Sequence, residues 1–319
     1  MRLSDLVRLR NNLEKFNAAQ AKLELDILEG HMSQQLNLPL HSDYSNNVQN
    51  LISHLANSNQ QIMEVECKIP GLITQIDREI KEITDDFLSR GYEINGYYGS
   101  DRTDVTTERD GRLMHISDET RSEIVVRLRG YTDWHYPCLE IGPGDGAWTE
   151  HLVAGDPLYI IDIHQEFLDS TLSKFNDIYR NRVRPYLADE THTDLRGSMN
   201  MLPKNQFGFI FSWNVFNYFP LTETRNMLTQ SMEMLRPGGT MMFSYNNCEV
   251  PQCAEYVEQG FRSWMPQSLL VETCKSLGFE IVATRAIEET VHWIEIRKPG
   301  ELKTVKAHQV LGKIVTINS

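Results

Sequence analysis

The stretch LEIGPGDGAW, residues 139–148, decides how the rest of the chain is interpreted. A strand predicted over 137–141 runs into three glycines at alternate positions, and a helix-compatible stretch over 147–153 follows at once. The glycines are Gly142, Gly144 and Gly146. Glycine has no Cβ, so this turn can adopt left-handed torsions and let a ligand approach the backbone closely. A glycine-rich turn between a strand and a helix N-terminus predicts a site for a nucleotide-type cofactor.

The acid Glu140, two positions before the first glycine, separates two classes of cofactor. Gly142-x-Gly144-x-x-Ala147 also fits the dinucleotide fingerprint. A carboxylate at position 140 would repel a pyrophosphate, whereas it would attract the ammonium and sulfonium of S-adenosylmethionine. The pattern acid-x-Gly-x-Gly-x-Gly resembles the first motif of class I S-adenosylmethionine-dependent methyltransferases. A nicotinamide oxidoreductase and a purely structural turn remain as alternatives.

Further acids and a turn follow in the order expected from this resemblance. Asp162 ends a predicted strand about 20 residues after the first glycine, where a carboxylate can accept hydrogen bonds from both ribose hydroxyls. The resemblance implies that Asp189 receives the adenine amino group and that the backbone of Glu190 lies against the ring. Residues 235–239, LRPGG, match the family's Leu-Lys-Pro-Gly-Gly turn. The chain departs from the family at Gly208, where an aspartate is common.

Strand and helix signals alternate through the rest of the chain, which predicts an α/β fold with a mostly parallel sheet and helices on both faces. The last two strands are joined by a short link, so they must pair as an antiparallel hairpin. Seven strands with such an ending are the arrangement of the Rossmann-like class I methyltransferases. The strands are predicted over 137–141, 158–163, 183–187, 207–213, 240–244, 279–285 and 291–297, and the helices over 165–176, 221–235 and 267–277.

The stretch SWNVFNYFP, residues 212–220, follows the fourth strand, and ligands bind at the carboxyl ends of parallel strands. Asn214 is assigned to the cofactor site, and Trp213, Asn217 and Tyr218 join it as candidates to line the acceptor pocket. The Asn-Pro-Pro-Tyr signature of amine methylation on nucleic acid bases is absent. No constellation selects a catalytic base from its candidates, and no metal site is predicted. The candidate bases are His115, His192 and His292.

Before this domain, residues 3–29 and 45–89 carry leucine and isoleucine at alternating spacings of three and four, as in a coiled coil. Pro70 interrupts the second segment without shifting its phase, which predicts a kinked helix. We expect a helical hairpin or a coiled coil between subunits, with Gln20 and Ser58 as polar layers. The surplus length of the second helix, about 72–87, would need a further partner, and a homo-oligomer is expected.

Residues 91–111 are rich in Gly, Asp, Asn and Thr and predict a long loop, a candidate lid. Ser117 is expected to cap a helix that runs to Arg129 and covers the cofactor edge. The predicted domains are the arm at 1–90, the lid and covering helix at 91–136, the cofactor-binding domain at 137–299, and a tail at 300–319.

Composition narrows the function classes. The formal net charge is −13, which disfavours a groove that follows nucleic acid phosphates. The chain has five scattered cysteines, no long apolar run and a charged N-terminus, so we expect reduced thiols, no membrane segment and a cytoplasmic location.

These features predict methyl transfer from S-adenosylmethionine, with S-adenosylhomocysteine as product, to a small molecule or protein. A non-catalytic assembly protein that retains the fold is the alternative.

Overall fold

A computed structural model describes residues 2–15, 42–89, 116–188, 199, 201–260 and 262–302. The chain divides into two compact units, Met1–Tyr92 and Glu93–Ser319. Within the described residues, no helix combines the length and the apolar character that crossing a membrane requires.

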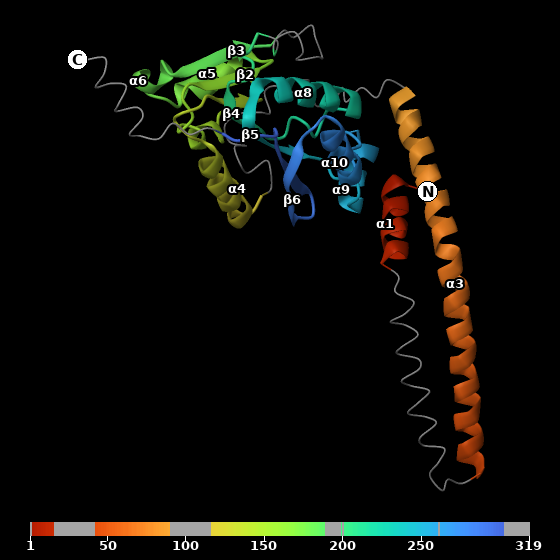
Figure 1. Cartoon of the computed structure of the whole chain (residues 1–319). Helices are drawn as coiled ribbons and strands as arrows, with labels where there is room; N and C mark the ends of the chain where they lie inside the picture. Colours follow the sequence, from red (N-terminus) through yellow and green to blue (C-terminus); the bar gives the residue numbers. More distant parts are fainter. Residues whose placement is uncertain are drawn as a thin grey trace. The chain divides into compact units, whose positions relative to one another are not determined.

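The second unit is built on a seven-stranded sheet with the order β3-β2-β1-β4-β5-β7-β6 (Figure 1). Pairing is parallel from β3 through β5, and β7 runs antiparallel to both β5 and β6. The predicted seven-stranded α/β class and its closing hairpin are therefore confirmed. The strands are β1 (Cys138–Ile141), β2 (Leu158–Asp162), β3 (Val183–Leu187), β4 (Phe207–Ser212), β5 (Leu235–Tyr245), β6 (Glu280–Glu288) and β7 (Val291–Arg297).

Helices cover both faces of the sheet, and each face has its own apolar core. One core includes Leu228 and Leu270 from α8 and α10. The other includes Ile124 of α4, Leu152 directly after the 3-10 helix η3, and Leu168 of α5. The described helices of this unit are α4 (Asp118–Tyr131), η3 (Thr149–His151), α5 (Gln165–Ser173), α6 (Asp177–Arg180), α8 (Leu221–Met234), α9 (Pro251–Glu258) and α10 (Gln267–Ser276).

The covering helix begins as predicted, because the Ser117 side chain accepts a hydrogen bond from the Thr120 backbone N–H. The same end of α4 is tied to the β6–β7 hairpin by Glu288, whose Oε1 accepts from the Ser117 N–H at 2.7 Å and from the Thr120 hydroxyl at 2.6 Å. Those donors lower the pKa of Glu288 against the opposing effect of its burial.

Two local predictions were wrong. The helix expected over 147–153 is only the single 3-10 turn η3. Its segment ends before the Gly155-Asp-Pro sequence, and Trp148 and Leu152 within it are both buried. The LRPGG segment is part of β5: the pairing shifts register between Phe207/Leu235 and Phe209/Thr240, so the glycine turn is an irregularity within the strand.

The first unit contains α1 (Leu3–Glu14) and the long α3 (Ser42–Ser89), which pack together and are joined by Arg10 Nε donating to Asp77 Oδ1 at 2.6 Å. The helix continues through Pro70. Ile76 and Ile80, within the predicted surplus at 72–87, are buried, and the further partner expected for this segment stays a prediction. Leu9 and Leu72, both seam positions, are 40% and 44% exposed. Gln20 lies outside the described residues, and the coiled coil between subunits stays a prediction.

Candidate cofactor and acceptor site

The three glycines of the loop after β1 all have left-handed torsions, with φ of 70°, 57° and 88° in chain order. A Cβ on Gly142 would lie 2.3 Å from Val215 Cγ2, and one on Gly146 would lie 3.0 Å from Thr171 Oγ1. A Cβ on Gly144 would meet nothing within 4 Å. The outer glycines therefore allow close packing, whereas the middle glycine borders open space that a ligand could fill.

Glu140 lies in β1 directly before this loop and is 1% exposed. Thr149 Oγ1 donates to Glu140 Oε2 at 2.6 Å. Burial raises the pKa of this carboxyl to about 8, and the nearby Asp162 and Asp145 act in the same direction. Thr149 and Lys174 oppose the rise. The carboxyl is thus buried and mostly protonated at pH 7, and a nearby cation would favour its ionised form.

Asp162 closes the neighbouring strand β2 and is 7% exposed. Its Oδ1 accepts a hydrogen bond from the His164 backbone N–H at 3.0 Å. Burial raises the pKa of Asp162 to about 6, although backbone N–H groups of His164, Gly144 and Ile163 oppose the rise. Two buried carboxyls therefore flank the open middle of the glycine loop.

The other predicted cofactor residues divide into two groups. Asp189 and Glu190 lie outside the described residues, as do His115 and His192. Asn214 follows β4 with a φ of 55°, and its backbone N–H donates to Ser244 Oγ at 2.7 Å. Its Oδ1 accepts from Asn217 Nδ2 at 2.7 Å.

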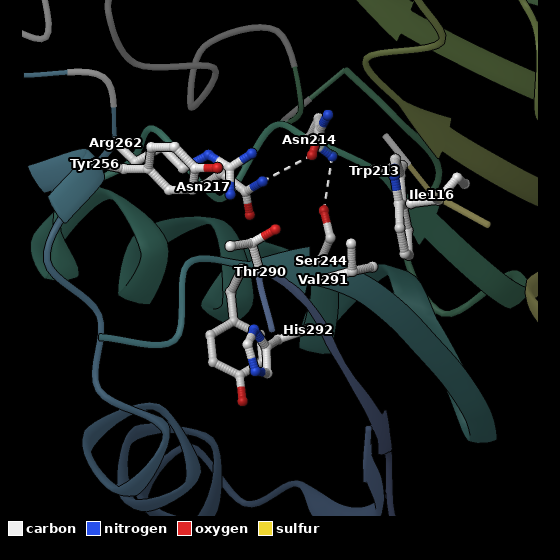
Figure 2. A pocket seen from close by; sticks show the side chains of 11 residues that line it. Ile116, Trp213, Asn214, Asn217, Ser244, Tyr256, Arg262, Thr290, Val291 and His292 are labelled. Atoms are coloured by element: carbon white, nitrogen blue, oxygen red, sulfur yellow. Dashed lines mark hydrogen bonds between the residues drawn. The ribbon is translucent and has the colours of Figure 1, made fainter. Parts of the chain in front are cut away.

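A pocket lies at the carboxyl ends of β4 and β5, next to the start of the antiparallel β7 (Figure 2). Of the predicted pocket residues, Trp213, Asn214 and Asn217 line it. Tyr218 does not, and its carbonyl accepts a hydrogen bond from Ser263 Oγ at 2.8 Å. The remaining lining residues are Ile116, Ser244, Tyr245, Tyr256, Arg262, Thr290, Val291 and His292.

His292 is the one candidate base that the structure places in this pocket wall. It is 2% exposed, and its Nδ1 lies 3.8 Å from Cys253 Sγ. Burial, with a contribution from the Arg262 charge, lowers the pKa of His292 to about 4. The imidazole is therefore neutral at pH 7.

Sequence reasoning missed Ser244, Tyr256 and Arg262. Ser244 could have been found, because β5 is parallel to β4 and its end must lie at the same edge. Arg262 follows α9, a helix that the sequence did not predict, and no periodic pattern marks its segment.

Comparison with known proteins agrees with this geometry. Residues 138–239 match the family model described as a methyltransferase domain, and no curated protein matches the chain. Residues 138–239 thus form a methyltransferase domain. The expected enzyme class, an S-adenosylmethionine-dependent methyltransferase, is confirmed by this match together with the sheet order.

Solved structures with this fold are distant in sequence. A putative methyltransferase from Haloferax volcanii in complex with its Trm112 activator is 11% identical, with a TM-score of 0.51 over 63% of this chain and 98% of that chain. A SAM-dependent methyltransferase from Aquifex aeolicus is 16% identical, with a TM-score of 0.46 over 62% and 98%. The N-methyltransferase NodS from Bradyrhizobium japonicum is 16% identical, with a TM-score of 0.42 over 57% and 96%.

Proposed function

We propose that this methyltransferase domain binds S-adenosylmethionine over the glycine loop and delivers its methyl group to an acceptor held in the pocket beside Trp213 and Asn214. The observation that carries the proposal is the open space at Gly144, flanked by the buried carboxyls of Glu140 and Asp162. A ligand could occupy this space, because a Cβ built on Gly144 would meet no atom within 4 Å.

Each cofactor residue is assigned a role from its chemistry. Glu140 would compensate the ammonium and sulfonium charges, and Asp162 would accept hydrogen bonds from the ribose hydroxyls. Asp189 and Glu190 would hold the adenine, and Asn214 would border the methionine end. When bound, the cofactor supplies a methyl group activated by the positive sulfur.

The residues of the pocket contribute position and exclusion of water. Methyl transfer is an in-line displacement, so orientation of the acceptor and desolvation provide most of the acceleration. The neutral His292 is a weak base with its pKa near 4. An acceptor whose attacking atom need not lose a proton to a base suits this wall better than an alcohol does.

The acceptor is proposed to be a small molecule or a protein side chain. The chain is acidic, with 44 Asp and Glu against 31 Lys and Arg, and the pocket is lined by a single arginine and no lysine. Nucleic acid would require an extended cationic surface.

The first test is the binding of S-adenosylhomocysteine by titration calorimetry. Asp162→Ala should weaken binding by about 1.5–3 kcal/mol, the range of hydrogen bonds to a charged group. Asp169→Ala, at an exposed carboxylate on α5 that accepts from Gln165, is the matched control and should bind like the wild type. Unchanged affinity in Asp162→Ala would remove the ribose role. Methyl transfer itself is tested with labelled cofactor against protein, small-molecule and nucleic acid fractions of a lysate.

A further inference from the structure

The acceptor pocket differs in charge from the rest of the chain. Although the chain has a net charge of −13, none of the pocket's lining residues is Asp or Glu. Its one permanently charged side chain is Arg262. A pocket with a cation and no carboxylate, in an acidic protein, is suited to an anionic ligand.

The guanidinium of Arg262 is fixed in place without being neutralised. It lies over the Tyr256 ring, 4.6 Å from the centroid, and the Arg262 backbone N–H donates to the Tyr256 carbonyl at 3.3 Å. The next residue, Ser263, anchors the segment by donating its N–H to the Asn217 carbonyl at 2.8 Å. Among the residues that the structure describes, no carboxylate lies within 4 Å of this guanidinium. Its hydrogen-bonding capacity is therefore available to a ligand.

Asn217 is a second, independent indication of a ligand site. Its side chain is 3% exposed and lines the same pocket, with Nδ2 donating to Asn214. Its Oδ1 is buried and has no hydrogen-bond partner in the described part of the chain. A buried acceptor without a donor costs free energy, and such groups are normally satisfied. Figure 2 shows this amide beside the Arg262 guanidinium, with Trp213 and Ile116 across the pocket.

We propose that the acceptor carries a carboxylate or phosphate, which Arg262 binds, and a hydroxyl or amine donor, which satisfies Asn217 Oδ1. This inference rests on the proposed function, because it describes the substrate of the same site. Arg262 then determines specificity by forming an ion pair with the acceptor's anionic group. The Tyr256 ring holds the guanidinium in the orientation needed for that ion pair. The carboxylate of the cofactor is the competing anion, so the test must separate the two.

The test uses the full-length protein saturated with S-adenosylhomocysteine, which occupies the cofactor site. Two probes of one shape, 4-hydroxybenzoate and 4-hydroxybenzamide, differ in charge, and phenyl phosphate tests the phosphate class. Calorimetric titration should show the carboxylate or the phosphate binding about tenfold or more tightly than the amide. Arg262→Met should abolish that preference, and Arg262→Lys should restore part of it. Arg236→Met is the matched control, because Arg236 lies 5.0 Å over the Tyr136 ring and does not line the pocket.

Equal binding of all probes, no binding of either anion, or a preference that survives Arg262→Met would overturn the inference. Loss of S-adenosylhomocysteine affinity in Arg262→Met would assign the guanidinium to the cofactor's carboxylate and would also overturn it. If the wild type does not bind S-adenosylhomocysteine, the proposed function fails. The probe titration without cofactor then still decides whether the pocket selects anions.

Discussion

Glu140→Gln should raise the free energy of unfolding of the cofactor-free protein. The same substitution should lower the affinity for the cofactor. The substitution keeps an oxygen that can accept from Thr149 Oγ1 but removes a carboxyl whose ionised form is disfavoured by burial. The pKa of Glu140 rises from 4.5 to about 8 on folding. Between these values the folded state binds more protons than the unfolded state, so the free energy of unfolding falls as pH rises through that window.

The expected magnitude follows from the two pKa values. Each unit of pKa difference corresponds to about 1.36 kcal/mol. At pH 7 the pH lies roughly 2.5 units above the pKa of the unfolded state, so about 2.5 units of the difference contribute. The wild type therefore loses about 3 kcal/mol by pH 7, relative to its stability below pH 4.5. A glutamine at position 140 does not titrate and escapes this loss.

The measurement is urea unfolding of both proteins without cofactor at pH 5, 6, 7 and 8. The stability difference in favour of Glu140→Gln should grow by about 3–4 kcal/mol across this range. Glu150→Gln, an exposed carboxyl with 55% of its side chain accessible, is the control and should follow the wild type. Parallel pH curves for the wild type and Glu140→Gln would refute the reasoning. S-adenosylhomocysteine should bind Glu140→Gln more weakly, because its ammonium loses a compensating charge.

Three further predictions concern separate parts of the chain. Gly144→Val should abolish S-adenosylhomocysteine binding in calorimetry while retaining the circular dichroism spectrum; normal binding would show that the loop is not the site. Arg127→Ala should lower the free energy of urea unfolding by about 3 kcal/mol, because it leaves the fully buried carboxylate of Glu295 without its ion pair. In the wild type, Arg127 Nη1 lies 2.8 Å from a carboxylate oxygen of Glu295. A loss under about 1 kcal/mol would contradict this. We also propose that the arm, residues 1–90, joins subunits. Removal of these residues should give a smaller oligomer that still binds cofactor. Light scattering that finds the full-length protein to be a monomer would contradict this proposal.

The fold could be predicted from the sequence because its signals are local and repeated. Alternation of apolar strands and amphipathic helices gives the α/β class, and the short link before Val291 requires the antiparallel end. Boundaries failed where tertiary packing overrides local propensity. The segment after Gly146 has helical composition, yet its turn is tightened because Trp148 and Leu152 both enter the core.

The part of the candidate site that could be predicted is the glycine turn, because it depends on local backbone conformation. Glycines at 142, 144 and 146 predict a turn. Only the structure shows that a side chain on Gly144 would enter open space, whereas one on Gly142 or Gly146 would collide with neighbouring residues. The pocket depends on long-range contacts, which sequence spacing does not report. Arg262 and Asn217 line one pocket although they lie 45 residues apart, and nothing in either segment alone predicts this.

The charges on the two sides of the site are opposite, and this arrangement favours the reaction. The glycine-loop side presents the carboxyls of Glu140 and Asp162, which suit a cation, and the pocket side presents Arg262, which suits an anion. Each reactant would therefore be bound on its own side of the site by a group of opposite charge. Attack by a neutral lone pair on a sulfonium spreads the positive charge of the sulfur over both reactants in the transition state. Such a step gains from a site that excludes water, because electrostatic interactions strengthen as the local dielectric constant falls. With His292 neutral, the rate would depend on this charge placement and on acceptor geometry more than on proton transfer.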